Sequence, residues 1–459
     1  MRFDTCILLL SGILLAFLRP ARAAGEEVCP WLEISPSTAA NGMGNLTSPY
    51  SEDPLAIWFL PGVSGIGPAA SQATLVEYSG YSPRTDWVPE FVELGETFGS
   101  WAVRVRTPLN AALDAVSRKA HSLSRRSKVP MTLSLGVIHH RLSHSSWTEI
   151  FHDGNTVSLV RAKDDYATSF RMELGWQLKQ WQFGAGLGYD HVTSNIGPIT
   201  IASQNLDHVT GRISTFDWGL AAERKIIDRV PLQALPGSPL LLELGMAGSW
   251  ARNFIGGELA YVPESSGDPM PRMDRLALAS RFRVIHGGSG RTADLELLRL
   301  HVAAEHSATL IHKYLASVTI NGIPDTDPGG YATSRESTDA PDTYAYAMDY
   351  RLFNKDIFSK DDTTNRNWGA ELSLLDMVTL RKGRHEDQAW NSHESTQGWG
   401  LDSNGLFRLI ERALPGSHDT SVLGWMLESV RVRYDHARWE SDTPGNGTRF
   451  RQLTMAISF

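Results

Sequence analysis

The side chains best suited to chemistry lie in the segment "HHRLSH", where His139, His140 and His144 are the types that hold transition metals. On a β-strand successive side chains point to opposite faces, so His139 and His140 could share an ion only across a bend. Hydroxyl and imidazole groups also gather here: Ser143, His144, Ser145, Ser146 and His152. No spacing among them makes a nucleophile motif. We therefore expect no metal site, no cofactor and no enzymatic activity.

Composition and the first residues indicate a compartment. The chain has 51 acidic and 43 basic residues, so it lacks the basic excess that nucleic-acid binding usually needs, and we expect no nucleic-acid partner. Arg2 is followed by an apolar run over 7–18 and then by Ala21-Arg22-Ala23, an A-x-A cleavage signal. The run is shorter than the roughly 20 residues of a spanning helix. Residues 1–23 are thus predicted to be a secretory signal peptide.

Long stretches of the remaining chain alternate apolar and polar residues with the period of a β-strand. In "FRMELGWQLK", Phe170, Met172 and Leu174 face one way, and Arg171 and Glu173 the other. The next ten residues repeat the pattern, and Lys179-Gln180 is placed to form a tight turn between the two strands. Similar segments occupy 74–81, 100–106, 131–140, 212–222, 242–250, 276–284, 295–304, 344–352, 368–380, 430–439 and 450–459.

Strands of about ten residues with one apolar and one polar face suit a tilted crossing of a bilayer. Aromatic residues at strand ends, such as Trp176, Trp181 and Trp439, fit an interfacial girdle. The alternative is a soluble β-sandwich or solenoid, but soluble sheets rarely keep so long an alternation. We expect an all-β fold, a transmembrane antiparallel β-barrel of roughly fourteen strands over 71–459, integral to the cell outer membrane with the lipid bilayer as partner.

A few segments depart from this pattern. Helical spacing over 109–123, with Thr107 as N-cap and Pro108 at the first position, predicts a helix, with a basic cluster over 118–128 near its end. A second helix is predicted over 406–414. Polar stretches at 321–342, 359–367 and 383–397 predict long loops on one rim.

The last predicted strand has an apolar face made of Leu453, Met455, Ile457 and Phe459. A strand with an unpaired edge is an aggregation hazard unless the edge is closed, so we expect it to pair with the first strand of the barrel. Its pattern resembles the signal by which the barrel-assembly machinery recognises its clients. That machinery is therefore an expected partner.

The segment over 40–67, between signal and barrel, is neither alternating nor helical. It resembles the N-terminal signature of the FadL-like outer-membrane barrels, the fatty-acid and aromatic-hydrocarbon transporters, together with the PorV-like proteins of type IX secretion. The matching residues are Gly42, Met43, Gly44, Asp53, Pro54, Ala56, Trp58, Phe59 and Pro61, while Leu60 stands where the family has Asn. The segment over 371–387, with "TQGWGL" over 396–401, resembles a PorV-type hairpin.

The resemblance implies that residues 24–70 fold into the lumen as a plug. Trp58, Phe59 and Leu60 would then form the core of the plug or line an apolar ligand pocket, and the residues alone leave both readings open. The implied function is passage of a hydrophobic small molecule across the outer membrane. The alternative is a PorV-like partner for exported proteins. A hydrophobic ligand and a secreted or translocon protein are the corresponding candidate partners.

Overall fold

A computed structural model describes the chain over residues 29–66, 74–81, 86–87, 96–109, 130–143, 146–150, 157–161, 164–196, 199–201, 204–206, 209–232, 240–256, 258–259, 268–271, 273–287, 294–309, 319–320, 323–324, 364–387, 392–413, 429–440 and 448–459. The predicted signal peptide, the basic cluster over 118–128, His144 and the predicted strand over 344–352 lie outside these residues.

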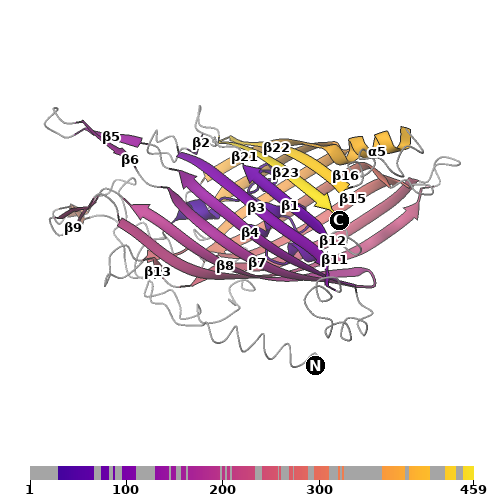
Figure 1. Ribbon diagram of the computed structural model, residues 1–459, viewed down its shortest axis with the longest axis horizontal. Coiled ribbons are helices and arrows are strands. Elements are labelled where there is room, and N and C mark those ends of the chain that lie inside the picture. The colour runs from indigo at the N-terminus through magenta and orange to yellow at the C-terminus, as the bar shows by residue number, and fades with distance from the viewer. Residues whose placement is uncertain are drawn as a thin grey trace, which may run out of the picture.

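The strands form one closed antiparallel barrel (Figure 1). Fourteen strands complete the ring, because β1 pairs with both β23 and β3, and the two-residue β2 only extends the edge of β3. The prediction of roughly fourteen strands is confirmed. The barrel strands are β1 (Leu75–Tyr81), β3 (Glu96–Pro108), β4 (Met131–Ser143), β7 (Asp165–Leu178), β8 (Trp181–Ile196), β11 (Val209–Pro231), β12 (Leu240–Gly256), β15 (Met273–His286), β16 (Leu295–Thr309), β19 (Thr364–Leu374), β20 (Val378–Asp387), β21 (Ser392–Asp402), β22 (Val430–Glu440) and β23 (Arg449–Ser458).

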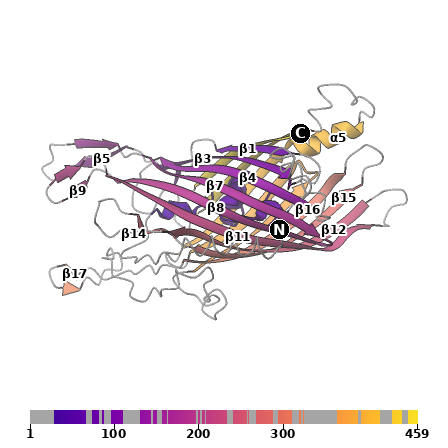
Figure 2. The ribbon, with the colours of Figure 1, turned by 60° about the horizontal axis from the view of Figure 1, so that its bottom comes forward.

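The two rims of the barrel differ. At the terminal rim, where β1 begins and β23 ends, Lys179 and Gln180 join β7 to β8 in a two-residue turn, and Lys179 has a positive φ of 55°. The opposite rim, here the loop rim, bears the outlying hairpins β5–β6 (Ser146–Ile150, Val157–Arg161), β9–β10 (Ile199–Ile201, Gln204–Leu206), β13–β14 (Glu258–Leu259, Asp268–Pro269) and β17–β18 (Thr319–Ile320, Ile323–Pro324). Figure 2 shows these hairpins at one end of the barrel.

Alternation along each strand sorts the side chains into two faces. On β7, Phe170 and Met172 are 52% and 48% exposed, while Arg171 and Glu173 between them are 2% and 1% exposed. The exposed apolar side chains continue around the barrel and form a belt, which includes Leu135, Leu220, Met246, Leu278, Val302, Leu380, Trp399, Leu453 and Met455. A closed barrel with an apolar outer belt and a polar interior is the architecture of an integral outer-membrane barrel.

Two expectations about the elements are wrong, and a third falls almost entirely outside the described residues. The stretch over 368–380 is not one strand, because Leu375 and Asp376 adopt positive φ and turn β19 into β20. The predicted loop over 383–397 lies mostly in β20 and β21, whose charged outward positions resemble a loop in sequence. Thr107 and Pro108, predicted to begin a helix, are the last residues of β3, and the predicted helix beyond Leu109 lies outside the described residues.

The helix predicted over 406–414 is confirmed as α5 (Ser403–Ala413), which lies at the terminal rim (Figure 1). Within the described residues, no helix has the length and apolar character to cross a membrane.

Residues Cys29–Ile66, here called the plug, lie inside the ring of strands (Figures 1 and 2). The plug consists of η1 (Pro30–Glu33), α2 (Thr38–Asn41), η2 (Pro54–Trp58) and η3 (Val63–Gly65), joined by irregular chain. Its elements contact opposite sides of the wall: α2 packs against β21, β22 and β23, and η3 against β4, β7, β8 and β11. Irregular backbone at membrane depth is tolerated when protein surrounds it.

Gly184 tests the close contact between plug and wall. A Cβ at Gly184 would lie 1.9 Å from the Gly62 carbonyl oxygen, so Gly184→Ala should displace the plug, with a cost of roughly 1–3 kcal/mol in the free energy of unfolding. Denaturant titration and limited proteolysis of the plug measure the effect. Gly248→Ala is the control, because its Cβ would meet only the flexible Leu278 tip at 3.3 Å and Ala277 O at 3.7 Å. Equal stability of the two variants would contradict the backbone contact.

Candidate functional site: the plug and the charged lumen

Asp53 and Pro54, both predicted site residues, begin the helical turn η2. The Asp53 side chain is the N-cap, since its Oδ1 accepts a hydrogen bond from the Leu55 N–H at 3.0 Å, and Pro54 occupies the first helical position. Asp53 also accepts hydrogen bonds from the Ser37 hydroxyl and, at 2.8 Å, from the Gln452 amide of β23. Asp53 therefore both shapes the plug and ties it to the wall.

Trp58, Phe59 and Leu60 lie in the apolar core of the plug, with exposures of 0%, 1% and 3%. Trp58 packs edge to face against Phe254 with ring centroids 5.9 Å apart, and its indole N–H donates to the Leu32 carbonyl at 3.4 Å. The three side chains pack against protein and do not line either of the two cavities described below. They therefore serve as packing in this structure.

Gly42, Met43 and Gly44 meet the hairpin that carries the second sequence resemblance. A Cβ at Gly383 of β20 would lie 2.3 Å from the Met43 carbonyl carbon, and the Thr396 hydroxyl of β21 donates to the Gly42 carbonyl at 3.2 Å. Gly44 has a φ of 83°, a conformation that favours glycine. The structure thus brings together two segments that lie more than 300 residues apart in the chain.

Pro61 and Gly62 form a second contact of main chain on main chain. A Cβ at Gly219 of β11 would lie 2.1 Å from the Pro61 carbonyl oxygen. Gly62 has a φ of 104°, and its N–H donates to Glu173 Oε1 at 2.8 Å. Glu173 Oε2 accepts from the Ser64 N–H at 3.1 Å, so one carboxylate of the wall satisfies two free donors at the start of η3.

Arg171 of β7 binds both the plug and two carboxylates of neighbouring wall strands. Its guanidinium donates to the Ile57 and Trp58 carbonyls at 3.2 and 3.0 Å, where η2 ends. The same group forms ion pairs with Asp190 at 3.0 Å and Asp217 at 2.5 Å, with all three side chains fully buried. A buried cation with two carboxylates is stable only while every partner is present.

Besides Glu173 and the group around Arg171, a further cluster of charged side chains lies on β1 and β3. Glu77 binds Arg104 at 2.6 Å and Arg106 at 3.1 Å, and Arg104 donates to the Glu52 carbonyl of the plug at 2.6 Å. The strand pattern predicted these polar inward faces. It could not show which carboxylate binds which guanidinium, because the pairs join different strands.

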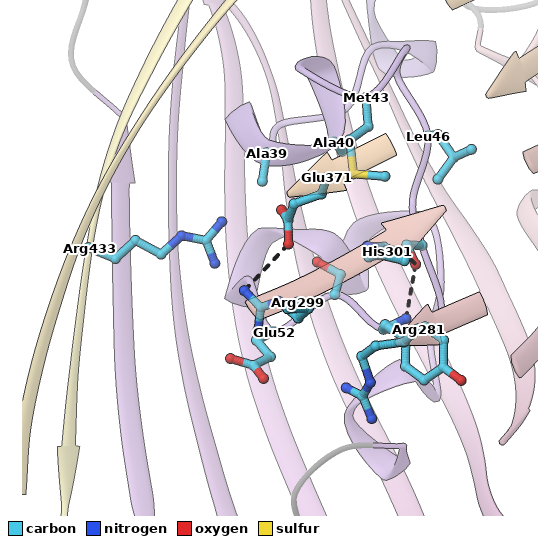
Figure 3. Close-up of a pocket in the computed structure, with 13 residues that line it drawn as sticks. Ala39, Ala40, Met43, Leu46, Glu52, Arg281, Arg299, His301, Glu371 and Arg433 are labelled. Atoms are coloured by element: carbon cyan, nitrogen blue, oxygen red, sulfur yellow. Dashed lines mark hydrogen bonds and ion pairs between the residues drawn. The ribbon is translucent and has the colours of Figure 1, made fainter. Parts of the chain in front are cut away.

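A small cavity remains between plug and wall, here called the lumen pocket (Figure 3). On the plug side it is lined by Ala39, Ala40, Met43 and Leu46, and on the wall side by Arg281, Arg299, His301, Glu371 and Arg433. Arg299 binds Glu371 at 3.4 Å, and Ser48 shares a hydrogen bond of 2.7 Å with His301. About 40 Å³ of it can hold the centre of a water molecule. The plug also contributes Ser48, Tyr50, Ser51 and Glu52, so its side of the pocket is part apolar and part polar, while three arginines and Glu371 lie on the wall side.

A larger cavity, here called the rim cavity, opens beside the plug toward the terminal rim, with about 180 Å³ available to the centre of a water molecule. Glu52 and Arg433 line both cavities. Glu52 binds Arg431 at 2.9 Å, and Arg431 also binds Asp402 at 2.6 Å. Burial raises the pKa of Glu52, but Arg431 and Arg299 lower it by more, so this pKa lies well below its usual range and the pair stays ionised.

His139 and His140 point to opposite faces of β4, as predicted. His140 is 1% exposed, and its Nδ1 shares a 2.6 Å hydrogen bond with Ser100, while His139 stacks on Trp101 outside the barrel. Within the ranges that the structure describes, no three His, Cys, Asp or Glu side chains are grouped to hold a metal ion.

The apolar residues of β23 fall as the sequence predicts. Leu453 and Met455 are 44% and 43% exposed on the outer face, and Phe459 is 72% exposed beyond the end of the strand. Ile457 pairs with Val76 of β1, which closes the ring. Their role as an assembly signal stays a prediction.

Comparison with known proteins gives structural matches only. No family model and no curated protein matches the chain. A FadL homologue from Pseudomonas aeruginosa matches at 12% identity and TM-score 0.36 over 95% of this chain and 99% of its own. A deletion mutant of TodX, a monoaromatic hydrocarbon channel, matches at 11% identity and TM-score 0.36, over 92% of this chain and 97% of its own. An outer membrane channel from Pseudomonas putida F1 matches at 10% identity and TM-score 0.27, over 84% of this chain and 95% of its own. At these values the likeness concerns the barrel fold.

Arg171→Met tests the charged contact between plug and wall. The change leaves Asp190 and Asp217 buried without their cation, so the free energy of unfolding should fall by about 3–5 kcal/mol. Denaturant titration in detergent measures it. Adding Asp217→Asn should restore part of the loss, because one uncompensated charge is then removed. A double variant no more stable than Arg171→Met would contradict the coupling.

Proposed function

We propose that this barrel mediates passage of a small, largely apolar molecule across the outer membrane, with the plug as the element that controls passage. The observation that carries the proposal is the pair of cavities beside the plug, which share Glu52 and Arg433 and extend from the lumen to the terminal rim. In outer-membrane barrels the short turns are periplasmic, so the terminal rim faces the periplasm. The cavities then mark the exit half of a route.

The lining of the lumen pocket indicates the chemistry of the molecule. Ala40, Met43 and Leu46 of the plug offer apolar contact. Arg281 and Arg299 of the wall offer hydrogen-bond donors, and they also pair with Glu223 and Glu371. Pockets that bind small molecules combine such an apolar surface with a few placed polar groups. An apolar body that carries an anionic group fits both sides.

The route is narrow in this structure, so passage requires movement of the plug. Glu52 lines both cavities and pairs with Arg431 of the wall, which lines the rim cavity, so this pair joins plug to wall. Glu52, Asp53 and the residues of η2 would move with the plug. We assign Trp58, Phe59, Leu60 and Pro61 to the packing that brings the plug back to its closed position. Gly42, Met43 and Gly44 form the contact of the plug with β20.

A second function, a PorV-like partner for exported proteins, is favoured by the dense bonding of the plug. Carboxylates and guanidinium groups of the wall hold main-chain atoms of the plug at Gly62, Ser64 and Ile57. A lumen closed in this way suits a barrel that binds another protein at its rim. Mass spectrometry after mild-detergent purification separates the two: a bound apolar small molecule supports passage, and a co-purifying secreted or translocon protein with an empty barrel supports the alternative.

Filling the rim cavity tests passage directly. Ala456 lines this cavity from β23, so Ala456→Trp should lower uptake of radiolabelled decanoate by intact cells toward that of cells lacking the protein. Decanoate combines an apolar chain with a carboxylate. Ala304→Trp is the matched control, since Ala304 is exposed on the outer face of β16, and it should leave uptake unchanged.

Folding of both tryptophan variants is checked by heat-dependent electrophoretic mobility, because folded barrels migrate differently before and after heating. Uptake by the folded Ala456→Trp variant at the level of the unchanged protein would contradict the proposed route.

A further inference from the structure

A group of basic side chains lies on the outer surface of three strands, β20, β22 and β23, on the loop-rim side of the apolar belt. Its members are exposed and occupy outward-facing positions of β20, β22 and β23. We call this group the basic patch: Lys382, Arg384, Arg438, Arg449 and Arg451.

Strand register brings the patch together. Lys382 is opposite Gln397, Gln397 is opposite Arg438, and Arg438 is opposite Arg449, so one line crosses β20, β21, β22 and β23. Paired strands lie about 4.8 Å apart, so the backbones of Arg438 and Arg449 are close neighbours. Arg451 is opposite His436 and shares the outward face of β23 with Arg449.

The patch keeps a surplus of positive charge. Arg384 binds Glu386 at 2.9 Å, and Arg438 lies 3.7 Å from Glu440. Among the described residues, neither Arg449 nor Lys382 forms an ion pair. Like charges on adjacent strands repel each other unless an anion lies between them.

The belt begins within two residues of the patch on the same strands. Leu380 precedes Lys382 by two positions, and Leu453 follows Arg451 by two, with exposures of 50% and 44%. Two residues span about 7 Å along a strand. Trp399, 41% exposed, lies in the same register row as His436 and Arg451, at the height where aromatic residues mark a membrane interface. A ligand that meets both surfaces must therefore carry anionic groups directly above acyl chains.

We propose that the basic patch binds the phosphate groups of a bisphosphorylated glycolipid of the outer leaflet, while its acyl chains lie on the belt beneath. Guanidinium groups hold phosphate oxygens with paired, charge-assisted hydrogen bonds, and three arginines on two adjacent strands can reach more than one phosphate. The continuity with the belt favours a lipid over an acidic protein. This site rests on the orientation of the barrel, with the loop rim outward, and not on the passage of any molecule through the lumen.

Native mass spectrometry of the purified full-length mature protein tests the proposal, with lipid A and chemically dephosphorylated lipid A as probes. The unchanged protein should bind lipid A at least about tenfold more tightly than the dephosphorylated form, equivalent to about 1.4 kcal/mol. The triple variant Arg438→Gln, Arg449→Gln and Arg451→Gln should lose that preference. Replacing the same three arginines by lysine should retain it in part, because the charge is kept.

The matched control removes three cations at the terminal rim: Lys179→Gln, Arg224→Gln and Lys225→Gln. It should bind lipid A as the unchanged protein does. Equal binding of the two lipids by the unchanged protein would overturn the proposal without any variant. Undiminished binding by the folded glutamine variant would also overturn it, as would an equal loss in the control. Binding of poly-glutamate in place of lipid A would assign the patch to an acidic protein partner instead.

Discussion

The contact of main chain on main chain between the plug and the wall is the constraint on which the rest of the lumen depends. At Gly184 and Gly219 the strands leave no room for a Cβ beside Pro61 and Gly62, and at Gly383 the same holds beside Met43. Such contacts fix the depth and rotation of the plug within a fraction of an ångström, because a main chain cannot yield as a long side chain can. They fit the inward face of β8, where Gly184, Gly186 and Gly188 occupy alternate positions.

Charged side chains of the wall then hold the plug in the position that the glycine contacts permit. Glu173 and Arg171, two residues apart on β7, bind the N–H groups that begin η3 and the carbonyl groups that end η2. Short helices have few internal hydrogen bonds, and their end groups need outside partners. The wall supplies these partners, so the plug gains its conformation from the barrel that surrounds it. Loosening the plug would expose several such groups together, which makes a concerted movement more favourable than a partial one.

The outer surface of the barrel is under a weaker constraint than the lumen, because it contacts lipid. Lipid selects apolar side chains without regard to their exact shape, so the belt needs only alternation and length. The basic patch is more specific, because the register that lines up Lys382, Arg438 and Arg449 depends on the pairing of strands that a reading of each strand alone does not contain. Alternation along β20 and β23 places Leu380 and Leu453 next to these charges on the same outward face.

The sequence by itself determined the class of fold, the approximate strand number, the two-residue turn at Lys179 and the helix near 406, because each depends on a local period or turn. It also indicated that Asp53, Pro54 and the glycines around Met43 belong to a special segment. It did not determine the turn at Leu375, the strands over 383–397, or the partners of Glu173 and Arg171. Those depend on which strands become neighbours and on how close a plug can approach them, and only the closed barrel decides both.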